Sequence, residues 1–329
     1  MQSREKKGHF VISLDFELMW GVWDVTTKEK YGDNITGVQK VIPRLISLFA
    51  EYDIKATFAT VGFLFAKDKE ELLQFNPEIF PTYNNESYDV YKKEVPGTGN
   101  NEKDDPYHFG HSLLEQLKNT PHEIGTHTYS HYYCLEEGQT AEQFTADISA
   151  AKKIAEKNGI HLESFVFPRN QVNEEYLDLL FANNITVYRG NPTGWIYKPR
   201  RFTAEVPFIR FCRLLDTYIR VSGYNTHIIK KEMNQPVNIP ASRFLKPYVP
   251  GLNWLEKLRM RRIKKEMTMA AQKNELYHLW WHPHNFGVNL EENIDFLTTL
   301  LKHYTMLNKK YGFTSLTMQQ AAAAVEIST

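Results

Sequence analysis

Short apolar runs alternate with helix-like segments along this chain, and this alternation is what most restricts the folds it can adopt. Residues 9–16 (HFVISLDF), 55–62 (KATFATVG) and 276–281 (LYHLWW) are apolar and contain β-branched or aromatic side chains, as buried strands do. Residues 37–54 lie between the first two runs and place apolar side chains at helical spacing. Strands that alternate with helices in this way predict an α/β fold with a parallel sheet or barrel.

The same alternation returns in the second half of the chain. Further strands are expected at 164–168, 185–190 and 313–318. Helical spacing of apolar residues predicts further helices at 140–159, 173–184, 254–272 and 290–312, and a short one at the end. Segment 254–272 is basic and has few apolar residues, so we interpret its charges as a solvated helix face and not as a membrane anchor.

Two segments interrupt the alternation. Residues 76–110 are rich in Asn, Tyr, Pro, Gly and Asp, and residues 190–250 are irregular and contain several prolines and aromatics. A loop as long as the first segment is usually functional or disordered. The tyrosines of residues 76–110 favour a position facing a substrate.

The charge balance and the apolar content exclude some classes of partner. Lys+Arg and Asp+Glu number 39 each, so no net field favours nucleic acid or an anionic membrane. Apolar windows such as ATFATVGFLFA are far shorter than a membrane span, and the N-terminus has no apolar stretch of signal-peptide length. The two distant cysteines, Cys134 and Cys212, make no disulfide framework. We therefore predict a cytoplasmic protein with free thiols and no stable membrane insertion.

Four polar clusters follow predicted strands. Because the ends of parallel strands converge in space, side chains that are distant in sequence can line one pocket there. The clusters are Asp15 with Glu17, His127 with His131, Arg169 with Asn170, and His282 with His284.

The second cluster lies within HEIGTHTYSHYY, residues 122–133, and has the spacing of a metal site. His127 and His131 are four positions apart, which places two imidazoles on one side of a turn. Two histidines and one carboxylate, with positions left for water, are the ligands of catalytic divalent sites, and Zn²⁺ suits nitrogen ligands best. His122 comes earlier in the segment and is expected to pack or hydrogen-bond locally.

The other clusters offer groups for acid–base chemistry. Asp15 and Glu17 point the same way in extended backbone, so one carboxylate can hold a metal while the other accepts a proton from water. Arg169 offers a rigid charged fork to a carboxylate. His282 or His284 could donate a proton to a leaving amine.

At these motifs the sequence resembles the polysaccharide deacetylases, the fourth family of carbohydrate esterases. HTYSH at 127–131 is similar to the second motif of the family, SLDFE to its first and LWWHPH to its last, in the same order, and the resemblance spans roughly residues 9–320. It implies one catalytic domain over residues 1–329 with insertions near 76–110 and 190–250. It also implies a distorted, seven-stranded (β/α) barrel that holds a divalent metal.

The resemblance gives the matching residues their roles. His127 and His131 match the metal histidines, and Asp15 matches the base. The family has two adjacent aspartates in its first motif, whereas here Phe16 stands between Asp15 and Glu17. Glu17 is therefore the predicted third metal ligand, and Asp15 stays an alternative.

The third and last motifs match less closely. Arg169 follows Pro168, although the family places its arginine before the prolines, and it is still the predicted partner of the base. His282 matches the acid that protonates the leaving group. We prefer it to His284, which remains the alternative, because it comes directly after the strand.

These roles lead to a functional expectation. The chain is predicted to be a metal-dependent hydrolase of carbon–nitrogen bonds that removes an N-acetyl or O-acetyl group from a sugar or polysaccharide precursor, with Zn²⁺ as the expected metal and Co, Ni or Mn as alternatives. Without a signal peptide, its substrate would be a biosynthetic intermediate such as a nucleotide- or lipid-linked sugar. Two other interpretations stay open, a hydrolase of a non-sugar amide or cyclic imide on the same fold, and a metal-free carbohydrate-binding pseudoenzyme. The sequence does not determine the oligomeric state.

Overall fold

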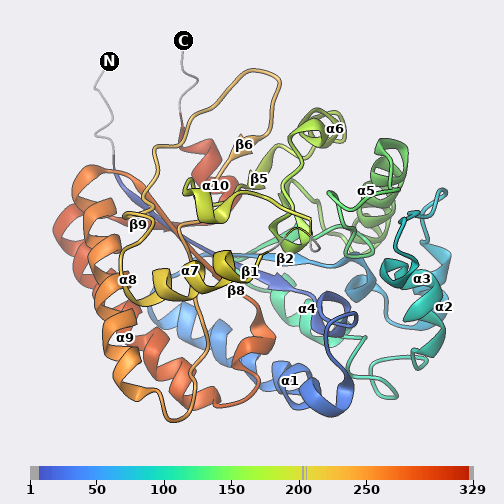
Figure 1. Cartoon of the computed structure of the whole chain (residues 1–329), viewed down its shortest axis with the longest axis horizontal. Coiled ribbons are helices and arrows are strands. Elements are labelled where there is room, and N and C mark those ends of the chain that lie inside the picture. Colours follow the sequence, from blue (N-terminus) through green and yellow to red (C-terminus); the bar gives the residue numbers. More distant parts are fainter. Residues whose placement is uncertain (1–6, 202–203, 205, 326–329) are drawn as a thin grey trace.

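Parallel strands form a single sheet at the centre of the molecule (Figure 1). The computed structural model describes residues 7–201, 204 and 206–325, so the ends of the predicted domain and three positions of the 190–250 insertion lie outside the described residues. The strands are β1 (His9–Phe16), β2 (Ala56–Thr60), β3 (Glu123–Thr126), β4 (Ser164–Val166), β5 (Val187–Arg189), β6 (Val237–Asn238), β7 (Arg243–Phe244), β8 (Leu276–Trp281) and β9 (Thr314–Leu316).

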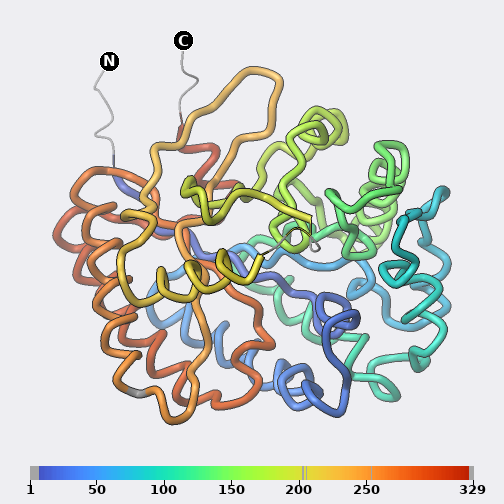
Figure 2. The backbone as a smooth tube through the Cα atoms, in the orientation of Figure 1, coloured from blue at the N-terminus to red at the C-terminus, as the bar shows by residue number. Residues whose placement is uncertain are grey.

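Helices surround the sheet. Figure 2 traces α8 and α9 side by side on one flank of the molecule and α5 on the opposite flank. The α-helices are α1 (Lys28–Glu51), α2 (Lys69–Gln74), α3 (Val90–Lys93), α4 (His111–Lys118), α5 (Ala141–Lys157), α6 (Leu177–Ala182), α7 (Pro207–Tyr218), α8 (Asn253–Lys273), α9 (Leu290–Tyr311) and α10 (Met318–Ala323). Among the described residues, no helix is both long enough and apolar enough to cross a membrane.

Strand β1 lies at the middle of the sheet and is almost completely buried. The strand order is β6-β5-β4-β3-β2-β1-β8-β7, and every pairing is parallel. β8 runs along one side of β1, while β9 and then β2 pair with the first and second halves of its other side. A strand buried on both faces must be apolar throughout, which explains the continuous apolar run of residues 9–16.

One segment, residues 237–245, links the two edges of the sheet. Its first part donates backbone hydrogen bonds to β5, from Val237 and Ile239, and its second part donates to β8, from Ser242 and Leu245. The short strands β6 and β7 therefore act as two halves of one bent strand. This bent strand joins β5 to β8, so the sheet curves into a distorted barrel. The predicted (β/α) barrel is confirmed. Its seven strands are β1 to β5, the bent β6–β7 strand and β8, and the short strand β9 pairs with β1 in addition.

Helix α1 connects the core to the loop that follows β8. Its buried face consists of apolar residues at helical spacing, such as Ile35, Val38 and Ile42. A glycine on this helix, Gly37, packs so closely against Gly287 that a Cβ atom there would lie 2.2 Å from the carbonyl oxygen of Gly287. This close approach holds the loop after β8 at a fixed distance from the barrel.

Two segments differ from the sequence interpretation. The basic helix α8 does not present all of its charges to solvent, because Arg259, Arg262 and Glu266 are buried. Glu266 accepts hydrogen bonds from both Arg262 and Arg243, and the buried Asp216 forms ion pairs with the same two arginines. Two negative and two positive charges therefore neutralise one another inside the molecule. Residues 76–110 contain the short helix α3 and 3₁₀ turns, although their sequence shows no clear periodicity.

Candidate metal centre and active site

Polar side chains from five strand ends meet on one face of the barrel. Asp15 and Arg189 lie in the last residues of β1 and β5, and the members of the four clusters other than Asp15 lie in the loops after β1, β3, β4 and β8. A parallel barrel presents all of its strand ends on one face, so this convergence follows from the topology.

Glu17 and two histidines form the closest group of metal-type ligands. Oε2 of Glu17 lies 3.4 Å from Nε2 of His127 and 3.4 Å from Nε2 of His131. All three side chains are buried, and their ligand atoms lie within 4.8 Å of one another. The structure thus brings together the three residues predicted to bind a metal.

The hydrogen bonds of the two histidines fit a metal between them. Nδ1 of His127 lies 2.8 Å from the carbonyl oxygen of Val166, which can only accept, so Nδ1 carries a proton and Nε2 is the atom turned toward Glu17. Nδ1 of His131 is buried and has no hydrogen-bond partner among the described residues. The two Nε2 atoms and the Glu17 carboxylate converge with the spacing of metal ligands, so the donor set fits a divalent ion.

Glu17 is buried among imidazoles. Burial by itself would raise the pKa of Glu17, but the surrounding rings of His282, His127 and His131 lower it well below its ordinary value. Gly21 makes room for this carboxylate, because a Cβ atom at position 21 would lie 1.9 Å from Cδ of Glu17.

The candidate metal loop, which carries His127 and His131, has an unusual backbone. Thr128 and His131 have φ of 65° and 58°, a left-handed conformation that non-glycine residues rarely adopt. Asp147 of α5 holds this loop, because its carboxylate accepts hydrogen bonds from the N–H of Tyr129 at 2.6 Å and from the hydroxyl of Ser130 at 2.5 Å. Helix α5 thereby fixes the direction of the imidazoles.

Asp15 has a different partner from that of Glu17. Arg189, at the end of β5, donates two parallel hydrogen bonds to the Asp15 carboxylate, at 2.6 and 2.8 Å. Burial would raise the pKa of Asp15, but the Arg189 guanidinium and His127 lower it, so the carboxylate stays ionised and able to accept a proton. The two carboxylates of the first motif therefore have separate surroundings.

A buried hydrogen-bond chain orients Arg189. The guanidinium donates to Oγ of Ser13 at 2.9 Å, and Oγ of Ser13 lies 2.8 Å from Nε2 of His278. Nδ1 of His278 lies 3.0 Å from the carbonyl oxygen of Ile239, so the ring donates there and accepts from Ser13. Trp280 stacks on the guanidinium at 4.2 Å. Burial and the nearby Arg189 lower the pKa of His278 to about 3, which keeps this ring neutral.

His282 lies between the two carboxylates. Its Nε2 is 3.7 Å from Oδ2 of Asp15 and 3.5 Å from Oε1 of Glu17, and its Nδ1 is 3.2 Å from Oδ1 of Asn285. The side chain is 23% exposed, whereas both carboxylates are almost fully buried, so His282 is the group a substrate can reach.

His284 stacks on His282 with ring centroids 4.9 Å apart. It is buried, and burial together with the neighbouring His282 lowers the pKa of His284 to about 3. Its Nε2 lies 4.0 Å from Glu17, and Glu17, His282 and His284 form a second group with metal-ligand spacing. A proton is therefore harder to place on His284 than on an ordinary histidine.

The structure puts Arg189, and not Arg169, beside the predicted base. Arg169 forms an ion pair with Asp24 and stacks on Tyr133, which places it next to the metal loop. Arg169 follows β4, whereas Arg189 is the last residue of β5. The position of these two strands in the barrel decides which arginine reaches Asp15. His122 packs against Phe49 and accepts a hydrogen bond from the chain, as expected.

Sequence reasoning missed three residues that shape the site, Arg189, Ser13 and Asp147. Arg189 is the last residue but one of the run ITVYRG, and a single charge near the end of an apolar strand was the available indication. Ser13 lies inside an apolar strand and Asp147 inside an ordinary helix, so neither had a local motif to identify it.

Comparison with known proteins agrees with this geometry. Residues 30–188 match the family model described as polysaccharide deacetylase. Residues 30–188 belong to the polysaccharide deacetylase family. The resemblance drawn from the motifs is confirmed, and the matched segment contains His127 and His131. No curated protein gave a match to the chain.

Solved structures share the fold at low sequence identity. A protein from Mycobacterium smegmatis that carries the name polysaccharide deacetylase aligns with a TM-score of 0.60 at 12% identity, over 99% of this chain and 92% of that one. A Pseudomonas aeruginosa protein of the same name aligns with a TM-score of 0.55 at 10% identity, over 96% and 88%. The α-amylase AmyC from Thermotoga maritima aligns with a TM-score of 0.57 at 10% identity, over 97% and 75%. At these identities the likeness concerns the fold, which two different activities share.

Proposed function

We propose that this chain is a metal-dependent deacetylase that hydrolyses the N-acetyl group of a sugar or polysaccharide precursor. The observation that carries the proposal is the buried carboxylate of Glu17 within 3.4 Å of the Nε2 atoms of His127 and His131. Family membership supports the deacetylase activity, and the donor set supports the metal.

The residues divide the chemistry between them. A divalent ion held by Glu17, His127 and His131 would supply a Lewis acid that polarises the acetyl carbonyl. Asp15, fixed by Arg189, accepts the proton of the attacking water. His282 faces both carboxylates and delivers a proton to the leaving nitrogen, so one group takes a proton and another returns it.

The test measures acetate release from N-acetylated sugars after loading with Zn²⁺, Co²⁺, Ni²⁺ or Mn²⁺. We expect one equivalent of metal in the wild type and none in His127→Ala, with full metal content in His161→Ala, because His161 is exposed and outside the site. His282→Ala should lower kcat by about 10²–10⁴-fold, the usual contribution of one proton transfer.

Three results would contradict parts of the proposal. Equal metal content in His127→Ala and the wild type would disprove the ligand assignment. A larger loss of kcat in His284→Ala than in His282→Ala would make His284 the acid. No turnover of any acetylated sugar by the metal-loaded protein would reject the function.

A further inference from the structure

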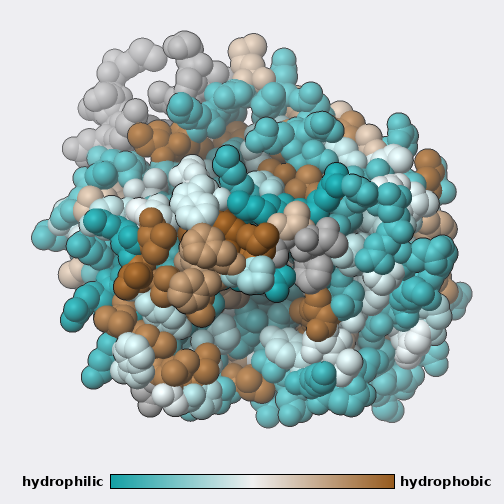
Figure 3. All heavy atoms as spheres, viewed as in Figure 1, coloured by the Kyte–Doolittle hydropathy of each residue, from teal (hydrophilic) through white to brown (hydrophobic). Residues whose placement is uncertain are grey.

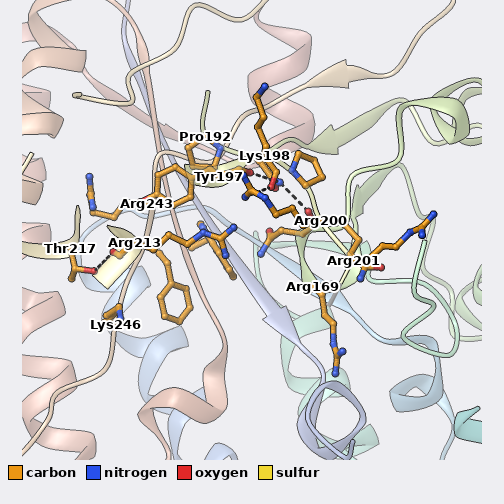
Figure 4. Close-up of a pocket in the computed structure, with 16 residues that line it drawn as sticks. Arg169, Pro192, Tyr197, Lys198, Arg200, Arg201, Arg213, Thr217, Arg243 and Lys246 are labelled. Carbon is orange, nitrogen blue, oxygen red and sulfur yellow. Dashed lines mark hydrogen bonds between the residues drawn. The ribbon is translucent and has the colours of Figure 1, made fainter. Parts of the chain in front are cut away.

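A basic cavity of about 330 Å³ lies beside the active site (Figure 4). Among the described residues that line it, none is Asp or Glu, although the chain as a whole has equal numbers of acidic and basic residues. The lining includes seven cationic side chains, Arg169, Lys198, Arg200, Arg201, Arg213, Arg243 and Lys246. Such a concentration of one charge sign marks a site for an anion.

Some of these cations already have a carboxylate partner. Arg169 pairs with Asp24, Arg201 with Glu137, and Arg243 with Glu266. These pairs are neutral and hold the walls of the cavity in place. The positive potential of the cavity therefore comes from the other cationic side chains that line it.

Arg200 and Lys246 have no carboxylate partner within the described part of the chain. Arg200 donates hydrogen bonds to backbone carbonyl oxygens, such as those of Trp195 and Lys198 at 3.0 Å, which leaves its charge uncompensated. Lys246 is half-buried, and burial and then the nearby Arg259 lower its pKa. The two side chains lie on opposite sides of the cavity (Figure 4), so an anion between them would meet positive charge from both directions.

The cavity is connected to the catalytic residues through shared walls. Phe244 and Trp280 line it, and their rings lie 5.8 and 5.6 Å from the ring of His282. Asn170 also lines the cavity, and its Oδ1 accepts a hydrogen bond from Arg189 at 3.1 Å. A molecule that places an acetyl group near His282 can therefore extend directly into the cavity.

We propose that this cavity binds a phosphate or diphosphate group attached to the acetylated sugar, an inference that rests on the proposed deacetylase function. Two cations without a carboxylate partner, Arg200 and Lys246, suit a group with more than one anionic oxygen, and arginine and lysine are the side chains that bind phosphate most often. The volume lies at the lower end of the range for small-molecule sites and suits one such group with the sugar beside it.

Either a nucleotide or a lipid carrier can supply this sugar phosphate. Helix α7 contributes Arg213 and Thr217 to the cavity, and it also exposes Phe208, Phe211 and Leu214. Figure 3 shows apolar surface gathered over this part of the molecule. The turnover experiment therefore compares the two carriers.

The first experiment measures binding of inorganic diphosphate by calorimetry. It uses metal-stripped protein, so that diphosphate cannot bind through a divalent ion. Lys246→Gln should weaken binding at least about tenfold, the usual worth of a hydrogen bond between charged groups. Lys246→Arg should keep most of the affinity. Lys302→Gln removes an exposed charge from α9, outside the cavity, and should bind as the wild type does.

His127→Ala separates this proposal from the proposed function, because it removes a metal ligand and leaves the cavity intact. It should bind diphosphate as tightly as the wild type. Absence of diphosphate binding by the wild type would overturn the proposal, and so would equal affinity in Lys246→Gln.

The second experiment compares turnover of an N-acetylhexosamine 1-phosphate with that of the free N-acetylhexosamine by the metal-loaded protein. The kcat/KM of the phosphate should be at least about tenfold higher in the wild type, and this preference should disappear in Lys246→Gln. Equal kcat/KM values for the two compounds in the wild type would overturn the proposal.

The carriers are then compared as a nucleotide diphosphate sugar and as a prenyl phosphate sugar in micelles. Turnover of either that depends on Lys246 supports the phosphate site and identifies the source. Diphosphate binding that depends on Lys246, without hydrolysis of any acetylated compound, would support the anion site and reject the deacetylase function.

Discussion

The two carboxylates of the first motif are only two residues apart, yet they have different neighbours. Asp15 is held by a guanidinium through two hydrogen bonds, whereas Glu17 is surrounded by imidazoles. A carboxylate whose two oxygens are already engaged by Arg189 is a poor metal ligand. The structure therefore favours Glu17 as the ligand and Asp15 as the base, a choice that the sequence left open.

At this scale we predict that Arg189→Lys lowers kcat by about 10²-fold, the usual cost of misplacing a catalytic group. Lysine keeps the charge but loses the planar fork that fixes both oxygens of Asp15. Metal content should stay at the wild-type value, because Arg189 does not contact the metal ligands. Arg169→Lys is the matched control and should cause a much smaller loss. A larger loss of kcat in Arg169→Lys than in Arg189→Lys would show that Arg169 is the partner of the base, as the sequence predicts.

The candidate site could be predicted from single residues only in part. Asp15, Glu17, His127, His131 and His282 could be found because each lies in a polar cluster directly after an apolar strand. Arg189 needed knowledge of which strands are neighbours across the barrel, since sequence motifs do not show that β5 faces β1.

At the scale of elements, long or strongly apolar segments could be predicted well. Strands β1 and β8 coincide with residues 9–16 and 276–281, because a buried strand needs a continuous apolar run. The two-residue strands β6 and β7 could not be predicted, because they are too short to show a period and form only by pairing with β5 and β8.

Helix α5 controls the metal loop through one titratable side chain. Burial raises the pKa of Asp147 from 3.8 to about 6, against the opposing effect of hydrogen bonds from Ser130 and Tyr129. Because this pKa is higher in the folded protein than in the unfolded chain, the folded state binds the proton more tightly between about pH 4 and pH 6. The stabilisation is complete below pH 4 and is lost as the pH rises through about 6.

We therefore predict that the difference in unfolding free energy between the wild type and Asp147→Asn falls as the pH rises from 4 to 7. The fall should be about 2–3 kcal/mol, since one pKa unit corresponds to about 1.4 kcal/mol. Urea unfolding at several pH values measures it. Asp178→Asn changes an exposed aspartate and should show no such trend. A difference that is constant or that rises with pH would contradict the assignment.

At the scale of the whole molecule, the candidate metal site joins parts of the barrel that are distant in sequence. Glu17 follows β1, whereas His127 and His131 follow β3, and β2 lies between these strands in the sheet. An ion bound there exists only when the barrel is assembled, so its binding free energy adds to the stability of the folded state. Without the ion, imidazoles still surround the Glu17 carboxylate and lower its pKa, so its negative charge favours the folded state at neutral pH.

This arrangement predicts opposite effects of metal and of removing the carboxylate. A metal concentration one hundred times Kd should stabilise the wild type by about 2.7 kcal/mol and raise Tm by roughly 5 °C. Glu17→Gln should lose this increase, and its Tm without metal should lie below that of the metal-free wild type, because the interaction between the carboxylate and the imidazoles is lost. Glu156→Gln, on the exposed face of α5, should respond to metal as the wild type does. If metal raised the Tm of Glu17→Gln as much as that of the wild type, the ion would bind elsewhere. A metal-free Tm of that variant above that of the wild type would contradict the stabilising contact between the Glu17 charge and the imidazoles.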